Sequence, residues 1–216
     1  MQHADDPLRF RVDNDQFGVL DSLVLHAMIA HARPRRIVEI GSGFSTLLMR
    51  ATHRALADGR IAIDCVEPYP RDFLRSGDMG IALHEVPVQS APASLFATLE
   101  ANDILFVDSS HVSKTGSDVN HIFFEILPRL AAGVIVHVHD IFLPFEYPKD
   151  WVIDQRRSWN EQYLLRALLM DNRRYRPLFG AAYATHACPD AMASIARSLD
   201  LSHVAGSSFW MRIDGG

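Results

Sequence analysis

The stretch RRIVEIGSGFSTLL, residues 35–48, joins an apolar run to a glycine-rich turn and then to a helix-forming run. A short apolar run that ends in glycine is typical of a buried strand. A strand, a glycine turn and a helix in direct succession form the first βα unit of a doubly wound sheet. In such sheets ligands bind beyond the carboxyl ends of the strands, so the turn at 41–43 is a candidate binding site.

The chain on both sides of this stretch alternates between helix-like and strand-like segments. Residues 17–32 carry apolar side chains at helical spacing and end before Pro34. Strands are predicted at 36–40, 61–66, 103–107 and 133–138, and helices between them at 45–58, 91–99 and 117–130. The C-terminal part predicts a helix at 158–172, a strand within 176–187, a helix from 189 and a last strand at 207–213.

This alternation predicts an α/β fold with a doubly wound, mostly parallel sheet of about seven strands. With 216 residues, of which 48% are hydrophobic, we expect a single domain over residues 1–216. Residues 1–34 would form an N-terminal helical extension. The aromatic and proline-bearing segment 141–160 would form a lid loop.

Composition indicates which kinds of binding partner to expect. The net charge of −5 does not favour a nucleic acid, so a small-molecule substrate is expected. No apolar run approaches about 18 residues, which predicts a cytoplasmic protein without membrane contact. Cys65 and Cys188 lack metal-type spacing and are interpreted as buried thiols. Whether the chain forms a homodimer stays open.

Three residues indicate the ligand of the turn. Gly41 and Gly43 allow a close backbone approach, and Glu67 ends the second strand, where an acid can accept hydrogen bonds from ribose hydroxyls. A dinucleotide-binding turn requires a third glycine, but Thr46 stands at that place. The pattern therefore favours an adenosine-type ligand other than a dinucleotide.

Four motifs carry a resemblance to a known family: VEIGSGFSTLLM (38–49), DCVEPYP (64–70), DILFVDSSH (103–111) and GVIVHVHDIFLP (133–144). In this order they resemble the class I S-adenosylmethionine-dependent methyltransferases, and among these the small bacterial O-methyltransferases that act on sugars and natural products. The resemblance implies a Rossmann-like methyltransferase fold with an antiparallel last strand. It also implies S-adenosylmethionine as cofactor and O-methylation of a small-molecule hydroxyl.

The resemblance also assigns cofactor contacts. Glu39 would face the amino end of the methionine moiety, the turn would approach the cofactor, and Glu67 would hold the ribose. Pro68 and the loop at 88–90 would lie near adenine, with Gln89 able to read its edge. The implied cofactor residues are Glu39, Gly41, Ser42, Gly43, Ser45, Thr46, Glu67, Pro68, Gln89, Asp108 and Ser109.

Four polar side chains follow the two central strands. Asp108 and His111 follow the strand predicted at 103–107, and His139 and Asp140 follow the strand predicted at 133–138, so we expect them to converge at one sheet edge. The resemblance to the catechol-type enzymes of this fold suggests that Asp108, His139 and Asp140 hold a divalent metal, magnesium or manganese. A histidine ligand favours softer ions than magnesium, although the two acids alone suffice for a hydrated one. The alternatives are helix capping by the acids and simple packing of His139.

His111 stands where the catechol-type enzymes carry a basic lysine, and we predict it as the general base, with His139 as its rival and Asp108 as the third catalytic residue. His137 is interpreted as a core histidine. An aromatic wall for the acceptor, or ordinary packing, is predicted for Phe142, Phe145, Tyr147, Trp151 and Trp159. Arg156, Arg157 and Glu161 lie near the lid and are interpreted as a solvated helix face in preference to a substrate clamp. Two other functions stay open: a nicotinamide-dependent oxidoreductase and a catalytically silent adenosine-binding subunit.

Overall fold

The chain folds around one seven-stranded sheet with the strand order β3-β2-β1-β4-β5-β7-β6. This computed structural model describes residues 8–12, 14, 16–56 and 61–215. The five strands β1 to β5 pair in parallel, and β7 runs antiparallel to both β5 and β6. The predicted doubly wound fold with an antiparallel last strand is therefore confirmed.

The element bounds lie close to the predicted ones. The strands are β1 Arg36–Ile40, β2 Ala62–Val66, β3 Ala82–His84, β4 Ile104–Val107, β5 Ile135–Val138, β6 Tyr175–Gly180 and β7 Phe209–Ile213. The helices are α1 Val19–Ala32, α2 Phe44–Leu56, α3 Ala93–Ala97, α4 Asp118–His121, α5 Lys149–Ile153, α6 Glu161–Leu169, α7 Ala181–Ala187 and α8 Pro189–Ser198. The predicted end of the second helix, at 57–58, lies outside the described residues.

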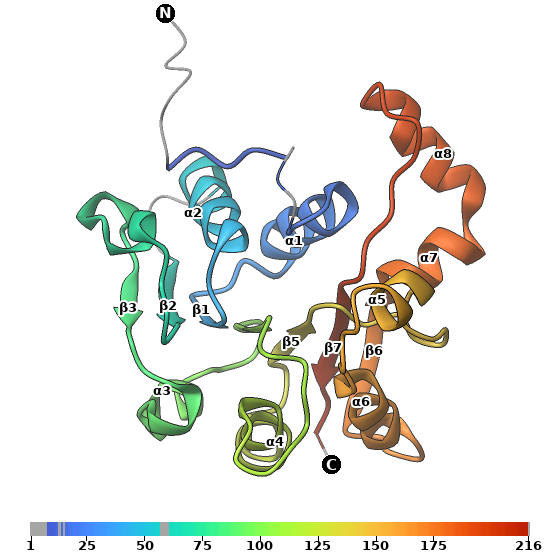
Figure 1. Cartoon of the computed structure of the whole chain (residues 1–216). Helices are drawn as coiled ribbons and strands as arrows, with labels where there is room; N and C mark the ends of the chain where they lie inside the picture. The colour runs from blue at the N-terminus through green and yellow to red at the C-terminus, as the bar shows by residue number, and fades with distance from the viewer. Residues whose placement is uncertain (1–7, 13, 15, 57–60, 216) are drawn as a thin grey trace, which may run out of the picture.

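Helices cover both faces of the sheet, with α1 and α2 on one face and α3, α4 and α6 on the other (Figure 1). Alternate strand residues supply the two cores, as the period of a strand requires. Ile37 and Phe106 pack with the α1 and α2 side chains. Val38 and Val107 pack with the residues of the opposite face. The carboxyl ends of β1, β2, β4 and β5 consequently meet at one edge, where the predicted polar residues lie.

The C-terminal third departs from prediction within the lid segment, where Lys149–Ile153 forms α5, and at the end of β6. A strand was predicted within 176–187, but β6 ends at Gly180 and residues 181–187 form α7. The alanine-rich sequence AAYATHA favours a helix, which explains the error. The helix predicted at 117–130 is also irregular, since a π-helical turn at Ile122–Ile126 and a 3₁₀ turn at Leu127–Arg129 continue α4.

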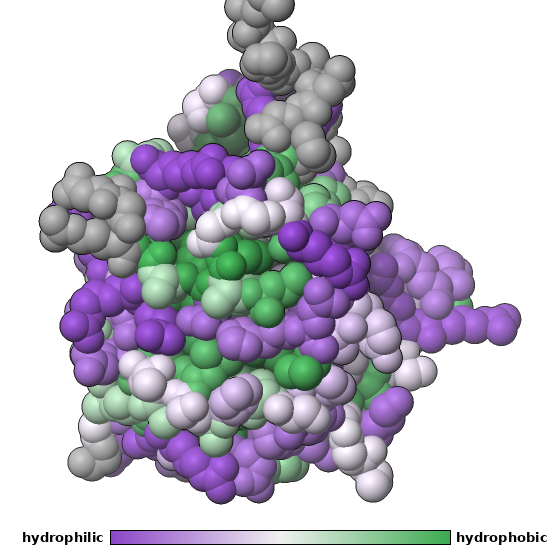
Figure 2. All heavy atoms as spheres, turned by 90° about the vertical axis from the view of Figure 1, so that its left-hand side faces the viewer, coloured by the Kyte–Doolittle hydropathy of each residue, from purple (hydrophilic) through white to green (hydrophobic). Residues whose placement is uncertain are grey.

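The β3 edge of the sheet is short and partly covered. Strand β3 contains three residues, and the 3₁₀ turns at Asp72–Arg75 and Gly77–Met79 precede it. Seen from this side, the surface mixes hydrophobic and hydrophilic side chains (Figure 2). A short edge strand limits pairing with other chains.

Two further sequence expectations concern membrane contact and the cysteines. In the described part of the chain, no helix is long and apolar enough to cross a membrane. Cys65 is buried as predicted, but Cys188 is exposed, because it lies between α7 and α8 at the surface. The expectation of two buried thiols is therefore wrong for Cys188.

Candidate active site

The turn after β1 is pressed against the loop after β4. Gly41 has a left-handed φ of 80°, and a Cβ atom here would lie 1.8 Å from the carbonyl oxygen of Asp108. Only glycine satisfies both conditions. Gly43 differs, because a Cβ atom at Gly43 would meet no atom within 4 Å. Gly41 therefore joins two loops, whereas Gly43 leaves open space beside the turn.

Glu39 is enclosed beneath this turn. The hydroxyls of Ser45 and Thr46, in the first turn of α2, donate hydrogen bonds to its carboxyl group at 2.6 and 2.5 Å. The thiol of Cys65 donates a third at 3.4 Å. Burial raises the pKa of Glu39 to about 7, although these hydrogen bonds oppose the rise. Glu39 anchors the start of α2, and its predicted contact with a methionine amino group stays a prediction.

Glu67 closes the other side of the turn. Its carboxylate accepts hydrogen bonds from the backbone N–H of Ser42 at 3.1 Å and of Tyr69 at 2.8 Å. A cavity of about 160 Å³, here called the turn cavity, lies beside it; the lining residues are Gln16, Phe17, Gly41, Ser42, Gly43, Phe44, Ser45, Glu67 and Asp108. Much of the predicted cofactor set therefore surrounds one cavity.

Other predicted cofactor residues lie outside this lining. The hydroxyl of Thr46 accepts from the backbone N–H of Gly43 at 3.1 Å. The Gln89 side chain donates to the Gly116 carbonyl at 2.9 Å and faces a separate cavity of about 320 Å³ beside α3. Pro68 and Ser109 also lie outside the lining of the turn cavity. Contacts of these residues with a cofactor stay predictions.

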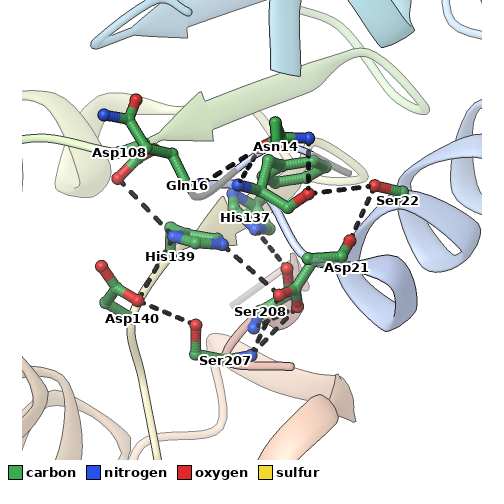
Figure 3. A network of polar contacts seen from close by, with 12 residues as sticks. Asn14, Gln16, Asp21, Ser22, Asp108, His137, His139, Asp140, Ser207 and Ser208 are labelled. Atoms are coloured by element: carbon green, nitrogen blue, oxygen red, sulfur yellow. Dashed lines mark hydrogen bonds and ion pairs between the residues drawn. The ribbon is translucent and has the colours of Figure 1, made fainter. Parts of the chain in front are cut away.

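Asp108, His139 and Asp140 come together at the ends of β4 and β5, as the strand order requires (Figure 3). The Nδ1 atom of His139 lies 3.7 Å from Asp108 Oδ1 and 3.5 Å from Asp140 Oδ1. One donor atom from each residue lies within 4.8 Å of the others. Burial opposes a charge on His139, but Asp108 and Asp140 outweigh it and raise its pKa well above the ordinary value. The three side chains thus bring one oxygen or nitrogen atom each to the same small region.

Asp21 of α1 supports this cluster from behind and was missed by sequence reasoning. Its Oδ2 atom lies 3.6 Å from Nε2 of His139. Its Oδ1 accepts from the backbone N–H of Ser207 at 3.0 Å and of Ser208 at 2.8 Å, and the Ser207 hydroxyl donates to Asp140 at 2.8 Å. Figure 3 shows Asp21 between α1 and the segment before β7. The available signal was that Asp21 is the only acid in residues 17–32.

His137 belongs to the core below the cluster. Its Nε2 atom lies 3.0 Å from the Ser208 hydroxyl, and its ring stacks on Phe106 with centroids 3.8 Å apart. Burial lowers the pKa of His137 well below its ordinary value, so the ring is neutral. This agrees with its interpretation as a core histidine.

His111 lies inside a ring of three carboxylates. Its Nδ1 is 2.9 Å from Glu161 Oε2, and its Nε2 is 3.3 Å from Asp108 Oδ1 and 3.5 Å from Asp140 Oδ2. Burial opposes protonation, but hydrogen bonds with Asp108 and Glu161 outweigh it and raise the pKa of His111 to about 10. Near neutral pH both ring nitrogens therefore carry protons. This arrangement does not favour the predicted role of His111 as general base.

The partner of His111 corrects another prediction. Glu161 was interpreted as part of a solvated helix face, but its side chain is fully buried at the start of α6. It lies there because the backbone N–H groups of Asn160 and Glu161 donate to the His111 carbonyl at 3.0 and 3.2 Å. These bonds fix the start of α6 to the loop after β4.

A larger cavity of about 580 Å³, here called the strand-end cavity, opens beside the cluster. Its lining comprises Asn14, Gln16, Gly18, Asp21, Asp108, His139, Asp140, Phe142, Trp151, Arg157, Trp159, Ala205, Gly206 and Ser207. Gln16 and Asp108 also line the turn cavity, so the two cavities adjoin. The volume suits a drug-sized or sugar-sized ligand.

Some aromatic residues of segment 141–160 line the strand-end cavity, and others do not. Phe142, Trp151 and Trp159 line the strand-end cavity, whereas Tyr147 is buried and Phe145 is 39% exposed outside the lining. Of the predicted aromatic wall, three members face the cavity. Arg157 also lines it, which corrects the interpretation of this residue as part of a solvated helix face.

Comparison with known proteins shows which family part of this chain is similar to. Residues 38–141 match the family model described as a methyltransferase domain. An uncharacterized protein of Archaeoglobus fulgidus is 42% identical over 109 residues, which cover 48% of this chain and 49% of that protein. The match therefore spans about half the length of this relative.

Solved structures share the fold at low identity. The S-adenosylhomocysteine-bound methyltransferase PaMTH1 of Podospora anserina superimposes with a TM-score of 0.57 at 21% identity, over 91% of this chain and 79% of that chain. A putative O-methyltransferase of Klebsiella pneumoniae gives a TM-score of 0.58 at 14% identity, over 99% and 93%. Residues 38–141 are therefore similar to a methyltransferase domain, and the seven-stranded sheet shares the fold of these methyltransferase structures.

Proposed function

We propose that this protein transfers a methyl group from S-adenosylmethionine to a hydroxyl of a small molecule, with the help of a divalent cation. The observation that carries the proposal is that the turn cavity and the strand-end cavity share Gln16 and Asp108. Methyl transfer is an in-line displacement at sulfur-bound carbon, so donor and acceptor must sit in adjoining spaces. The sugar or secondary-metabolite character of the acceptor belongs to the same proposal.

The turn cavity is the proposed cofactor site. Glu67 keeps acceptor lone pairs for two ribose hydroxyls, since each carboxylate oxygen accepts one backbone hydrogen bond. The open side of Gly43 gives a ligand close access to the backbone. Thr46 lies where a dinucleotide site has glycine and bonds to Glu39, which disfavours the oxidoreductase alternative.

Asp108, His139 and Asp140 fit a divalent cation. Their donor atoms converge, and Nδ1 of His139 faces both carboxylates. Asp21 faces the opposite nitrogen, Nε2, which otherwise lacks a partner among the described residues. A carboxylate in this position orients metal-binding histidines. The chemistry that a bound cation supplies here is a lowered pKa of the acceptor hydroxyl.

Asp108 is the proposed proton acceptor. It lines both cavities, and its side chain is 31% exposed, more than that of Asp140. As the oxygen–carbon bond forms and the sulfur–carbon bond breaks, the hydroxyl proton passes to an oxygen of Asp108. Protonated His111 holds this carboxylate in place through Nε2. Segment 141–160 is proposed as the lid that excludes water, because it supplies the aromatic lining.

Titration calorimetry with S-adenosylmethionine and S-adenosylhomocysteine tests the cofactor. We expect both to bind with one site per chain, and Glu67→Ala to weaken binding by about 1 to 3 kcal/mol, since hydrogen bonds to ribose are lost. Glu85→Ala is the matched control, because Glu85 pairs with Arg75 at the surface. Binding of NADH without binding of either methionine derivative would favour the oxidoreductase. Cofactor binding without transfer to any acceptor would favour the silent subunit.

A further inference from the structure

Arg157 occupies an unusual place in the strand-end cavity. Its guanidinium carbon lies 4.0 Å from the ring centroid of Trp151 and 4.4 Å from that of Trp159. The two indole rings meet edge to face, with centroids 5.2 Å apart and planes at 85°. The guanidinium therefore sits in a corner between two aromatic faces, which restricts its orientation.

The donors of this guanidinium are only partly used. Nε donates to the Gln155 side chain at 2.8 Å. In the described part of the chain, Arg157 has no carboxylate partner, and its terminal nitrogens donate no hydrogen bond to protein. The terminal N–H donors of the guanidinium are therefore available to a ligand. Planar paired donors match the geometry of a carboxylate.

The other charged groups of the strand-end cavity limit the negative charge of a ligand that binds Arg157. Among the described residues of the lining, the acids are Asp21, Asp108 and Asp140, which face His139, and Arg157 is the only arginine or lysine. A singly charged carboxylate balances Arg157, because His111 and His139 already face the three acids. Phe142, Trp151 and Trp159 supply apolar contact for a ring.

We propose that the strand-end cavity takes an acceptor with a ring and a carboxylate, and that Arg157 binds the carboxylate while the hydroxyl lies at Asp108. The role of this ligand as methyl acceptor rests on the proposed function. The binding of its carboxylate by Arg157 does not depend on that function. It narrows the substrate class to hydroxylated ring acids. Neutral sugars and neutral phenols lack the group that Arg157 would bind.

Nuclear magnetic resonance of the tryptophan indole N–H groups tests this directly. The chain contains three tryptophans, and Trp210 is fully buried in the core, so its signal serves as internal reference. The probes are 4-hydroxybenzoate and 4-hydroxybenzyl alcohol, which differ in the carboxylate. We expect the carboxylate probe to shift the Trp151 and Trp159 signals and to bind about tenfold or more tightly than the alcohol.

Two variants provide the comparison. Arg157→Gln should abolish the preference for the carboxylate, whereas Arg156→Gln should keep it, because Arg156 is exposed and lies outside the lining. Equal binding of the two probes, absence of indole shifts, or a preference that survives Arg157→Gln would each overturn the inference. An unchanged Trp210 signal shows that the variant is folded. S-adenosylhomocysteine titrated into the same samples separates the two proposals, since its failure to bind contradicts the proposed function alone.

Discussion

Gly41 and Gly43 belong to the same turn but have different physical roles. Gly41 combines a left-handed φ with a carbonyl oxygen 1.8 Å from the position of a Cβ atom, whereas Gly43 has free space there. We predict that Gly41→Ala lowers the free energy of unfolding by about 2 kcal/mol or more, through strain and the clash with Asp108. Gly43→Ala should leave it within about 1 kcal/mol. Urea denaturation of both variants measures the difference, and equal losses would contradict it.

Glu39 makes stability depend on pH. In the unfolded chain this group loses its proton near pH 4.5, and in the folded chain near pH 7, because burial raises its pKa. Between these values the folded state binds the additional proton. The free energy of unfolding should therefore fall as pH rises through this range, by about 3 kcal/mol for this group.

Glu39→Gln isolates this effect. The amide keeps an acceptor and a donor for the hydroxyls of Ser45 and Thr46 but does not titrate. We expect the difference in unfolding free energy between wild type and Glu39→Gln to change between pH 5 and pH 8, in favour of the variant at higher pH. Urea titrations across that range provide the test. Parallel profiles of the two proteins would show that the pKa of Glu39 is not raised.

At the scale of elements, the pair of His111 and Glu161 joins the loop after β4 to α6. His111→Asn keeps a residue that tolerates the left-handed φ of 60° but removes the positive charge beside buried Glu161. We predict that it lowers the free energy of unfolding by about 3 kcal/mol or more, since one partner of a buried ion pair remains alone.

The double variant His111→Asn/Glu161→Gln is the matched control. It removes both charges, so part of the lost stability should return. Denaturation of the single and double variants gives the coupling energy between the two side chains. If the double variant loses as much unfolding free energy as the two single variants added together, the ion pair does not stabilise the attachment of α6.

The elements also show what local patterns can predict. Apolar runs predicted β1, β2, β4 and β5, because buried parallel strands are largely apolar. Strand β3 was not delimited, because three residues with partly exposed side chains carry too little pattern. The boundary between β6 and α7 at Gly180 was missed, since an apolar segment has no distinct period on which to divide strand from helix.

For the whole molecule, the sheet topology explains which site residues were predictable. Asp108, His139 and Asp140 follow adjacent strands, so a parallel sheet brings them together. Asp21 and Glu161 reach the site from helices distant in sequence, and no local motif marks such contacts. The protonated state of His111 depends on Asp108 and Glu161 together, so its role could not be derived from its spacing to Asp108 alone. Arg157 was misjudged for the same reason, because its aromatic contacts depend on the fold of segment 141–160.

The central claim is that a cofactor in the turn cavity adjoins a cation held by Asp108, His139 and Asp140. Proton magnetic resonance of S-adenosylhomocysteine bound to the protein tests it most directly, with Mn²⁺ added as a paramagnetic ion and Mg²⁺ as the diamagnetic control. Because Asp108 lines both cavities, we predict that Mn²⁺ broadens the signals of bound S-adenosylhomocysteine and that a chelator reverses the broadening. Asp140→Asn should reduce the effect by weakening cation binding. Bound S-adenosylhomocysteine whose signals Mn²⁺ leaves sharp, or failure of S-adenosylhomocysteine to bind at all, would contradict the account.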